Sequence, residues 1–203
     1  MPAYFPVLLD LRGRRCLVVG GGEVGERKVR ALVDCGARVV VVSPTVTPAL
    51  QALVDAGVVR HHPRRFRRWD VRGCTLVVAA TGEENVDRAA ARSARRAGAL
   101  VNVVDRPGHC DFILPSVLRR GELQIAVSTG GRSPALARVI RQQLEPLFGA
   151  DCAALVERVG AARARARAAA VTRAARLDAG ERVVAAALRG GALPLGESSP
   201  GAC

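Results

Sequence analysis

Residues 14–25, RRCLVVGGGEVG, carry the strongest indication of the fold. The first seven residues form a short apolar run bounded by charge and glycine, which is typical of a buried strand. After the glycines, apolar side chains recur at helical spacing from Val24 to Cys35, and Gly36 is a helix stop signal. The sequence therefore predicts a strand, a glycine turn and a helix in immediate succession.

The alternation of strand and helix continues toward the carboxyl end. Further strands are predicted at residues 38–43, 58–59, 74–80 and 99–104. Thr47 can cap a helix that starts at Pro48, and another helix is predicted from Glu83 to Ala97. Strands that alternate with helices in this way form a parallel sheet with helices on both faces, so we expect an α/β domain over residues 1–111.

The pattern changes after residue 111. Apolar stretches at 112–118 and 122–128 predict an antiparallel hairpin, with Pro115 at an edge or a bulge. Ser133 and Pro134 mark the start of a helix that is expected to end at Gly149. We thus expect a small α+β segment over residues 112–149, a helical region over residues 150–190 with a break near 178–180, and a flexible tail over residues 191–203.

The composition narrows the class of protein. The chain has 203 residues, of which 49% are apolar and 24% charged, an ordinary globular balance that argues against disorder. No apolar run is long enough to cross a bilayer, and the first residues lack the pattern of a secretory signal, so we expect a cytoplasmic protein. The six cysteines include no CxxC pair, which argues against a disulfide framework and a cysteine-rich zinc site.

The formal net charge is +13, and every basic residue except Lys28 is an arginine. A strongly positive field attracts polyanions, which leaves nucleic acid, anionic lipid and a small molecule with many carboxylates as partner classes. The planar guanidinium fork favours carboxylates slightly. A codon bias toward arginine is the alternative explanation of the charge.

The glycines of the opening stretch contain a G-x-G-x-x-G pattern at Gly20, Gly22 and Gly25. Directly after a strand and at the start of a helix, this pattern is typical of a Rossmann-like dinucleotide site, with the pyrophosphate at the helix N-terminus. The acidic residue expected about twenty positions later to bind the ribose is missing, and the second strand ends instead in Ser43, Pro44 and Thr45. The choice between NAD and NADP stays open.

Asp105 ends the last strand of the alternating series. Ligands of open parallel sheets bind beyond the carboxyl ends of the strands, so its carboxylate is expected at the same crevice as the glycine turn, where it could act as a general base. Alternatively, Asp105 only begins a β-turn through Gly108, and the spacing favours neither interpretation.

Three other groups carry weaker signals. His109, Cys110 and Asp111 lack a spaced partner pair, so no metal site is predicted. The run RRFRRW at 64–69 could contact nucleic acid, but a solvated loop is the better interpretation. The run STGGRS at 128–133 is either an anion-binding loop or an ordinary capped helix start, and both interpretations stay open.

Taken in order, these residues resemble the precorrin-2 dehydrogenase family, whose NAD-dependent module is also the N-terminal half of bifunctional siroheme synthases. The resemblance spans nearly residues 1–150. The stretches that carry it are CLVVGGGEVGERKV (16–29), LVVAAT (76–81), VNVVD (101–105), FILPS (112–116) and AVSTGGRSPALAR (126–138).

The resemblance implies oxidation of precorrin-2, an anionic tetrapyrrole, to sirohydrochlorin with NAD as cofactor. It also implies a homodimer built through residues 112–149, a substrate-covering role for residues 150–190, and, in some members, insertion of Fe²⁺. Asp105 would be the catalytic base. The expected cofactor-binding residues are Gly20, Gly22, Glu23, Val24, Gly25, Ser43, Pro44, Thr45 and Thr81, and the expected substrate-binding residues are Asn102, Ser128, Thr129, Arg132 and Ser133.

Two other functions stay open at this point. A non-catalytic NAD(H)-sensing module would use the glycine turn but would give Asp105 no task. A nucleic-acid binder would use the net charge of +13 and would bind DNA in a salt-dependent way.

Overall fold

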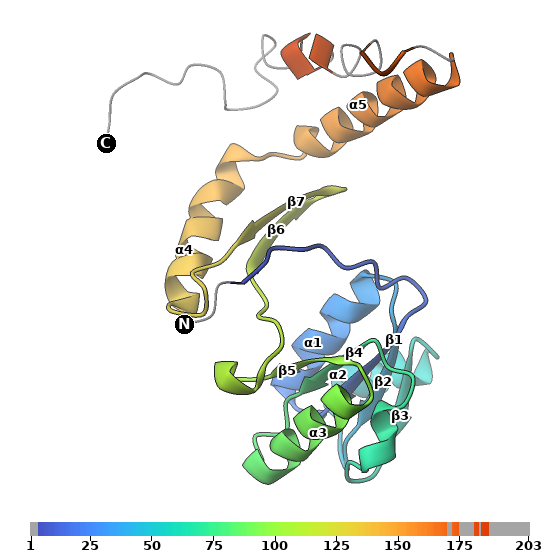
Figure 1. Ribbon diagram of the computed structural model, residues 1–203, viewed down its shortest axis with the longest axis vertical. Coiled ribbons are helices and arrows are strands. Elements are labelled where there is room, and N and C mark those ends of the chain that lie inside the picture. Colours follow the sequence, from blue (N-terminus) through green and yellow to red (C-terminus); the bar gives the residue numbers. More distant parts are fainter. Residues whose placement is uncertain (1–3, 170–171, 175–180, 183, 187–203) are drawn as a thin grey trace. The chain divides into compact units, whose positions relative to one another are not determined.

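The computed structural model describes residues 4–169, 172–174, 181–182 and 184–186, and the chain divides into two compact units, Met1–Ile113 and Leu114–Cys203 (Figure 1). The units are called unit 1 and unit 2 below, and each is described by itself. The expected tail at 191–203 and the expected helix break at 178–180 both lie outside the described residues.

Unit 1 contains a five-stranded parallel sheet, which confirms the α/β fold. Its strands are β1 (Arg15–Val19), β2 (Arg38–Val42), β3 (Val59–His62), β4 (Leu76–Ala79) and β5 (Leu100–Val103). Their order in the sheet is β3-β2-β1-β4-β5, so the chain reverses its direction of progress across the sheet between β3 and β4. The neighbouring strands β1 and β4 thus form the switch point at which open α/β sheets bind ligands.

Alternate residues of the strands serve the two faces of the sheet. Leu17 and Val19 of β1 belong to one buried cluster, whereas Cys16 and Val18 belong to the other. The helix α3 (Glu84–Arg96) contributes buried alanines to the first cluster. The helices α1 (Glu23–Asp34) and α2 (Pro48–Asp55) contribute to the second. Because helices cover both faces, the central strands β1, β2 and β4 carry runs of consecutive apolar residues and do not alternate with polar ones.

The helix caps follow the sequence signals. Thr47 accepts a hydrogen bond from the N–H of Leu50 at 3.1 Å, and Pro48 occupies the first helical position of α2, as predicted. Two short 3-10 helices, η1 (Arg68–Val71) and η2 (Pro107–His109), complete unit 1. The strand β3 is longer than the predicted pair at 58–59, because pairing with β2 extends through His61 and His62.

Unit 2 begins with the predicted hairpin, formed by β6 (Ser116–Arg120) and β7 (Leu123–Val127) in antiparallel pairing. Pro115 lies just before β6, so the strand is shorter than the predicted 112–118 and contains no proline. The helix α4 (Pro134–Leu144) also ends earlier than predicted, and η3 (Glu145–Leu147) follows it. Pro146 explains this end, because proline has no N–H to donate and its ring clashes with the preceding turn.

The last described long element is α5 (Asp151–Ala168). Among the described residues, no helix combines the length and the apolar character that spanning a bilayer requires.

Candidate functional site: the carboxyl edge of the parallel sheet

The predicted site residues of unit 1 gather where the parallel strands end. Gly20 follows β1 and Ser43 follows β2, while Thr81 and Asp105 each come two residues after β4 and β5. Backbone hydrogen bonds between neighbouring strands continue past the last paired residues, from Gly20 N to the Val42 carbonyl (3.0 Å) and from Val104 N to the Ala79 carbonyl (3.0 Å). These four positions therefore share one edge of the sheet.

The glycine turn is closely packed and has no room for side chains at three positions. A Cβ at Gly20, whose φ is +111°, would lie 2.4 Å from the carbonyl oxygen of Ala80. A Cβ at Gly25 would lie 2.2 Å from the carbonyl oxygen of Gly20, and one at Gly21 would lie 2.4 Å from that of Thr45. Gly21 was not among the predicted residues, because it is a variable position of the motif and only the structure shows what it faces.

Gly22 differs from its neighbours, because a Cβ there would meet nothing within 4 Å. It is the residue before α1, and no side chain caps the start of that helix. The first N–H groups of a helix have no partner within the helix and attract anions. An open glycine at an uncapped helix start fits the pyrophosphate of NAD(P), and the predicted residues Glu23 and Val24 form the first turn of α1 beside it.

Thr47 attaches the loop after β2 to the glycine turn and to α1. The N–H of Thr47 donates to the Gly21 carbonyl (3.0 Å), and its hydroxyl donates to Glu26 of α1 (2.6 Å). The hydrogen bond from Thr47, together with Arg30, lowers the pKa of Glu26 although burial opposes it. Of the predicted residues here, Ser43 is buried, whereas the remaining two, Pro44 and Thr45, are exposed. The loop thus leaves these two accessible at the sheet edge.

Thr81 is hydrogen-bonded to the carboxylate of Asp87, a residue that the sequence did not indicate. Its hydroxyl donates to Asp87 of α3 at 2.7 Å, and its N–H lies 3.2 Å from the same oxygen. Asp87 is buried, and no motif marks it in the sequence. The Thr81 hydroxyl also accepts from the N–H of Glu83 (3.0 Å), so its contacts in the structure shape the turn between β4 and α3.

Asp105 is exposed and has a left-handed backbone, with φ of +58°, which no other non-glycine residue of the described part of the chain has. The turn differs from the predicted one, which began at Asp105. It runs from Val103 to Arg106, closed by a hydrogen bond from Arg106 N to the Val103 carbonyl (3.3 Å), and Pro107 starts η2 instead. The left-handed conformation aligns Asp105 with the third position of this turn, where aspartate is better tolerated than most residues.

Lys28 of α1 is a second charged group near Asp105, and sequence reasoning did not select it as a site residue. Burial lowers the pKa of Lys28 and the charge of Arg27 lowers it further, whereas the carboxylate of Asp105 raises it. The two charges therefore interact. The sequence feature that sets Lys28 apart is that it is the only lysine in a chain rich in arginine.

Asn102 was expected to bind substrate, but its amide is used within unit 1. The residue lies in β5 and is 8% exposed. Its Nδ2 donates to the carbonyl of Phe112 (3.0 Å) and lies 3.6 Å from the sulfur of Cys110. These contacts fasten the segment after β5 back onto the strand, so any contact of Asn102 with substrate stays a prediction.

The other predicted substrate residues lie in the loop before α4 in unit 2. Ser133 caps α4 by accepting from the N–H of Leu136 (3.2 Å), as one of the two interpretations of this run expected. Thr129 accepts from the N–H of Ser133 (2.9 Å) and donates to its carbonyl (3.0 Å), and Ser128 accepts from Gly130 N (3.1 Å). Arg132 is exposed. Their role toward substrate stays a prediction.

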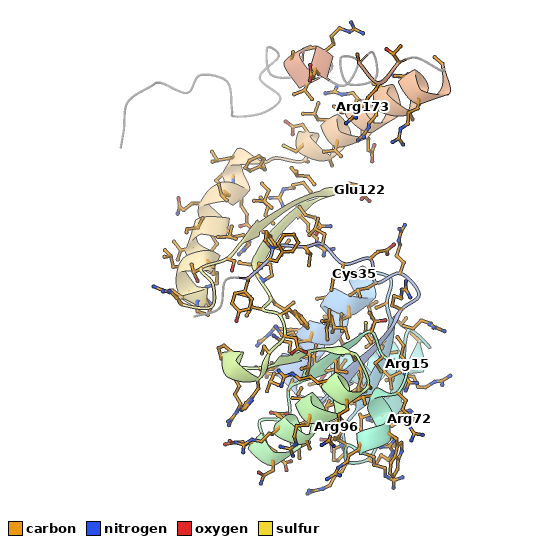
Figure 2. All side chains as sticks on the ribbon, viewed as in Figure 1. Arg15, Cys35, Arg72, Arg96, Glu122 and Arg173 are labelled. Carbon is orange, nitrogen blue, oxygen red and sulfur yellow. The ribbon has the colours of Figure 1, made fainter. Side chains whose placement is uncertain are left out.

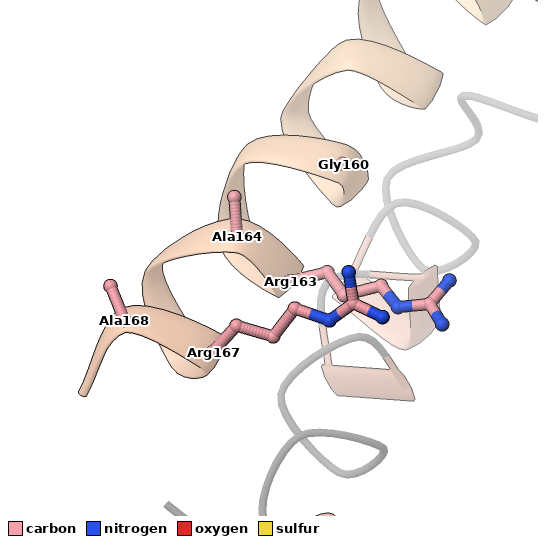
Figure 3. Close-up of a pocket in the computed structure, with 5 residues that line it drawn as sticks. All are labelled: Gly160, Arg163, Ala164, Arg167 and Ala168. Atoms are coloured by element: carbon pink, nitrogen blue, oxygen red, sulfur yellow. The ribbon is translucent and has the colours of Figure 1, made fainter. Parts of the chain in front are cut away.

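Both units carry basic side chains outside the residues described so far. Figure 2 labels Arg15, Arg72 and Arg96 in unit 1 and Arg173 in unit 2. On α5, a pocket is lined by Gly160, Arg163, Ala164, Arg167 and Ala168 (Figure 3). The side chains of Arg163 and Arg167, one helical turn apart, extend to the same side of α5 in that view. Within the described residues, no group of three or more histidine, cysteine, aspartate or glutamate side chains is arranged to hold a metal ion.

Comparison with known proteins agrees with this geometry. A family described as putative NAD(P)-binding matches residues 7–116, and a family described as sirohaem biosynthesis protein central matches residues 120–146. Siroheme synthase 1 of Aeromonas salmonicida is 40% identical over 196 residues, which cover 97% of this chain and 42% of that protein. Siroheme synthase of Nitrosomonas europaea is 44% identical over 155 residues, which cover 76% of this chain and 33% of that protein.

The chain therefore spans less than half the length of these relatives. Among solved structures, that of SirC, a precorrin-2 dehydrogenase, matches with a TM-score of 0.76 and 25% identity over 89% of each chain. The family matches cover both the glycine turn and the hairpin, and the structural match covers nearly the whole chain. The chain belongs to the NAD(P)-binding family of sirohaem biosynthesis proteins, the family that includes precorrin-2 dehydrogenase.

Proposed function

We propose that this chain catalyses the NAD-dependent oxidation of precorrin-2 to sirohydrochlorin. The observation that carries the proposal is the position of Asp105, an exposed carboxylate at the same edge of the sheet as the open glycine Gly22. The names of the relatives support it, since one is a precorrin-2 dehydrogenase and others are siroheme synthases. The family described as putative NAD(P)-binding covers residues 7–116, which include both Gly22 and Asp105.

The reaction removes two hydrogen atoms from the substrate. One C–H bond would break and its electron pair would leave with the hydrogen as hydride; NAD⁺, held at the glycine turn, would supply the hydride acceptor. The second hydrogen leaves as a proton, and the Asp105 carboxylate accepts it. Gly22 and the first turn of α1 would hold the pyrophosphate, while Lys28 places a positive charge near the base. The proton then passes from Asp105 to solvent, because the side chain is exposed.

The substrate carries many carboxylates, and the charge of this chain suits it. Arg132 is exposed beside the start of α4, and Arg163 and Arg167 extend to one side of α5 (Figure 3). Guanidinium groups bind carboxylates through paired hydrogen bonds. We therefore assign substrate binding to Ser128, Thr129, Arg132 and Ser133, and covering of the substrate to the helical region that includes α5, as the resemblance implies.

We further propose that the protein is a homodimer assembled through residues 112–149. Leu136, Val139 and Ile140 lie on α4 at helical spacing, and each is more than a third exposed. Leu114 and Val117 of the hairpin segment are exposed as well. Apolar side chains gathered on one small unit are typical of a surface that a partner covers.

Insertion of Fe²⁺ into sirohydrochlorin is the second candidate activity, with the ion as a substrate. It would release two protons from the macrocycle, and Asp105 would accept them one at a time, passing the first to solvent before it accepts the second. The proposal of dehydrogenation does not depend on it.

The test is anaerobic incubation of the purified chain with precorrin-2 and NAD⁺, followed by NADH absorbance and the sirohydrochlorin spectrum, first without Fe²⁺ and then with it. NADH formation in step with sirohydrochlorin is expected. Binding of NAD without NADH formation would favour the NAD(H)-sensing module, and retention on DNA that tetrapyrrole does not displace would favour the nucleic-acid binder. A spectral change with Fe²⁺ above the uncatalysed rate would assign the second activity.

A further inference from the structure

The segment that follows β5 folds back beside that strand and brings Cys110 next to the turn that carries Asp105. The N–H of Asp111 donates to the Val101 carbonyl (2.8 Å), and the Asp111 carboxylate accepts from the N–H of Val101 (3.0 Å). Arg95 of α3 donates to the same carboxylate at 2.7 Å. Cys110 is thus held in place by contacts that do not involve its own side chain.

The sulfur of Cys110 lies between the two ends of the Asp105 turn. It accepts from the N–H of Val103 (3.1 Å), and it is within donating distance of the carbonyl oxygens of Val103 (3.2 Å) and Arg106 (3.3 Å). Val103 and Arg106 are the first and last residues of the turn. One side chain therefore contacts the backbone on both sides of Asp105.

The chemistry of the thiol suits this contact. Burial raises the pKa of Cys110, so that the thiol keeps its proton at neutral pH and remains a donor. The side chain also packs against the buried cluster on the α3 face of the sheet, which restricts its movement. A left-handed aspartate costs energy that surrounding contacts must offset.

We propose that the thiol of Cys110 is the positioning group of the active site: by fixing both ends of the turn from Val103 to Arg106, it holds the Asp105 carboxylate where it accepts the substrate proton. The inference rests on the proposed function of Asp105. Cys110 itself touches no substrate, and its effect acts through the backbone of the turn.

The test compares three substitutions at Cys110 with a matched control. Cys110→Val removes the hydrogen-bonding sulfur but keeps an apolar side chain of similar size, Cys110→Ser keeps a donor and acceptor, and Cys110→Ala serves if valine does not fold. The control is Cys74→Val, because Cys74 belongs to the same buried cluster, and its thiol contacts the carbonyl of Asp70 (3.7 Å) and the side chain of Arg15, neither of which belongs to the Asp105 turn.

The kinetic readout is kcat and KM for precorrin-2, with the Kd for NAD measured separately. We expect kcat of Cys110→Val to fall by about tenfold or more, since a small misplacement of a reacting group has an effect of this size, with KM and the Kd for NAD unchanged. Cys110→Ser should recover most of the loss, and Cys74→Val should keep kcat within about twofold.

A second readout does not depend on turnover. Burial and Arg27 lower the pKa of Lys28, and the charge of Asp105 partly offsets them. A displaced Asp105 should therefore lower the pKa of Lys28 further. Labelling with lysine that carries ¹³C at Cε alone gives a single resonance, because Lys28 is the only lysine. Cys110→Val should lower the pKa of Lys28, and Cys74→Val should not. Unchanged kcat and an unchanged Lys28 pKa in Cys110→Val would overturn the inference, whereas a wild-type protein without turnover but with the Lys28 shift would overturn only the proposed function.

Discussion

The carboxylate of Asp105, which follows β5, raises the pKa of Lys28 on α1. Burial and the nearby charge of Arg27 lower the pKa of Lys28, and the Asp105 carboxylate acts in the opposite direction by raising it. A residue of the helix that begins at the glycine turn thus responds to the charge of the proposed proton acceptor. A negative charge near the amine favours its protonated form.

The first prediction follows from the sign of this interaction. Asp105→Asn removes the charge that raises the pKa of Lys28, so the pKa of Lys28 should fall further below its usual value. The single ¹³C-lysine resonance, titrated over alkaline pH, measures it directly. The control is Asp34→Asn, because Asp34 is exposed and is the last residue of α1. This substitution should leave the pKa of Lys28 unchanged.

The second prediction separates two glycines of the same turn. Gly25→Ala places a Cβ 2.2 Å from the Gly20 carbonyl oxygen, so we expect a loss of about 1–3 kcal/mol in the free energy of unfolding. Gly22→Ala meets no atom within 4 Å and should cost less than about 1 kcal/mol. It should nevertheless weaken NAD binding by about tenfold or more, because the methyl group would occupy the approach of the pyrophosphate.

Urea denaturation and calorimetric titration with NAD⁺ measure the two effects. If Gly22→Ala bound NAD as tightly as the wild type, the pyrophosphate would not lie at this glycine.

The third prediction concerns pH and the ion pair of Asp70 in η1. Burial alone would raise the pKa of Asp70, but two hydrogen bonds from Arg64 (2.9 and 2.7 Å) and one from the N–H of Arg67 (2.7 Å) outweigh it, and the net pKa is lowered. Because the pKa in the folded state is below the unfolded value of about 3.8, the stabilisation is complete above that pH and is lost as the pH falls through the folded pKa.

Asp70→Asn should therefore lower the free energy of unfolding by about 1–3 kcal/mol at pH 7, and the difference from the wild type should shrink below about pH 3.8. Urea titrations from pH 7 to pH 2.5 measure it. Asp55→Asn, an exposed residue of α2, should show a smaller effect at pH 7. A difference that is constant with pH would show that the charge of Asp70 does not matter.

The fourth prediction tests the dimer surface of unit 2. Val139→Glu places a charge among the exposed apolar residues of α4 and should shift the protein from dimer to monomer in sedimentation velocity. Arg138→Glu introduces the same side chain at the neighbouring exposed position and should leave the dimer intact. A wild-type protein that sediments as a monomer at micromolar concentration would contradict the proposed assembly.

The sequence contained enough to predict the scaffold of the site. Short apolar runs located four of the five strands and the first residue of β3, and Thr47 and Ser133 cap helices as their spacing indicated. These features depend on interactions between residues close together in the chain, or on strands buried on both faces, and both leave a local pattern.

What the sequence missed depends on contacts between distant residues. The turn at Asp105 begins at Val103 and not at Asp105, and its two end residues contact Cys110, while Asp111 binds Val101 of β5. Asp87 accepts a hydrogen bond from Thr81, and the pKa of Lys28 is affected by the charge of Asp105. No spacing rule connects the two residues of either pair. The polar end of β3 is a strand only because β2 pairs with it.

The most direct test of the central claim is the turnover of Asp105→Asn with precorrin-2 and NAD⁺ under anaerobic conditions, measured beside its Kd for NAD. Because asparagine keeps the shape of the side chain but does not accept a proton at neutral pH, NADH formation should fall by about a hundredfold or more while NAD binds as in the wild type. Turnover within a few fold of the wild type would contradict the account.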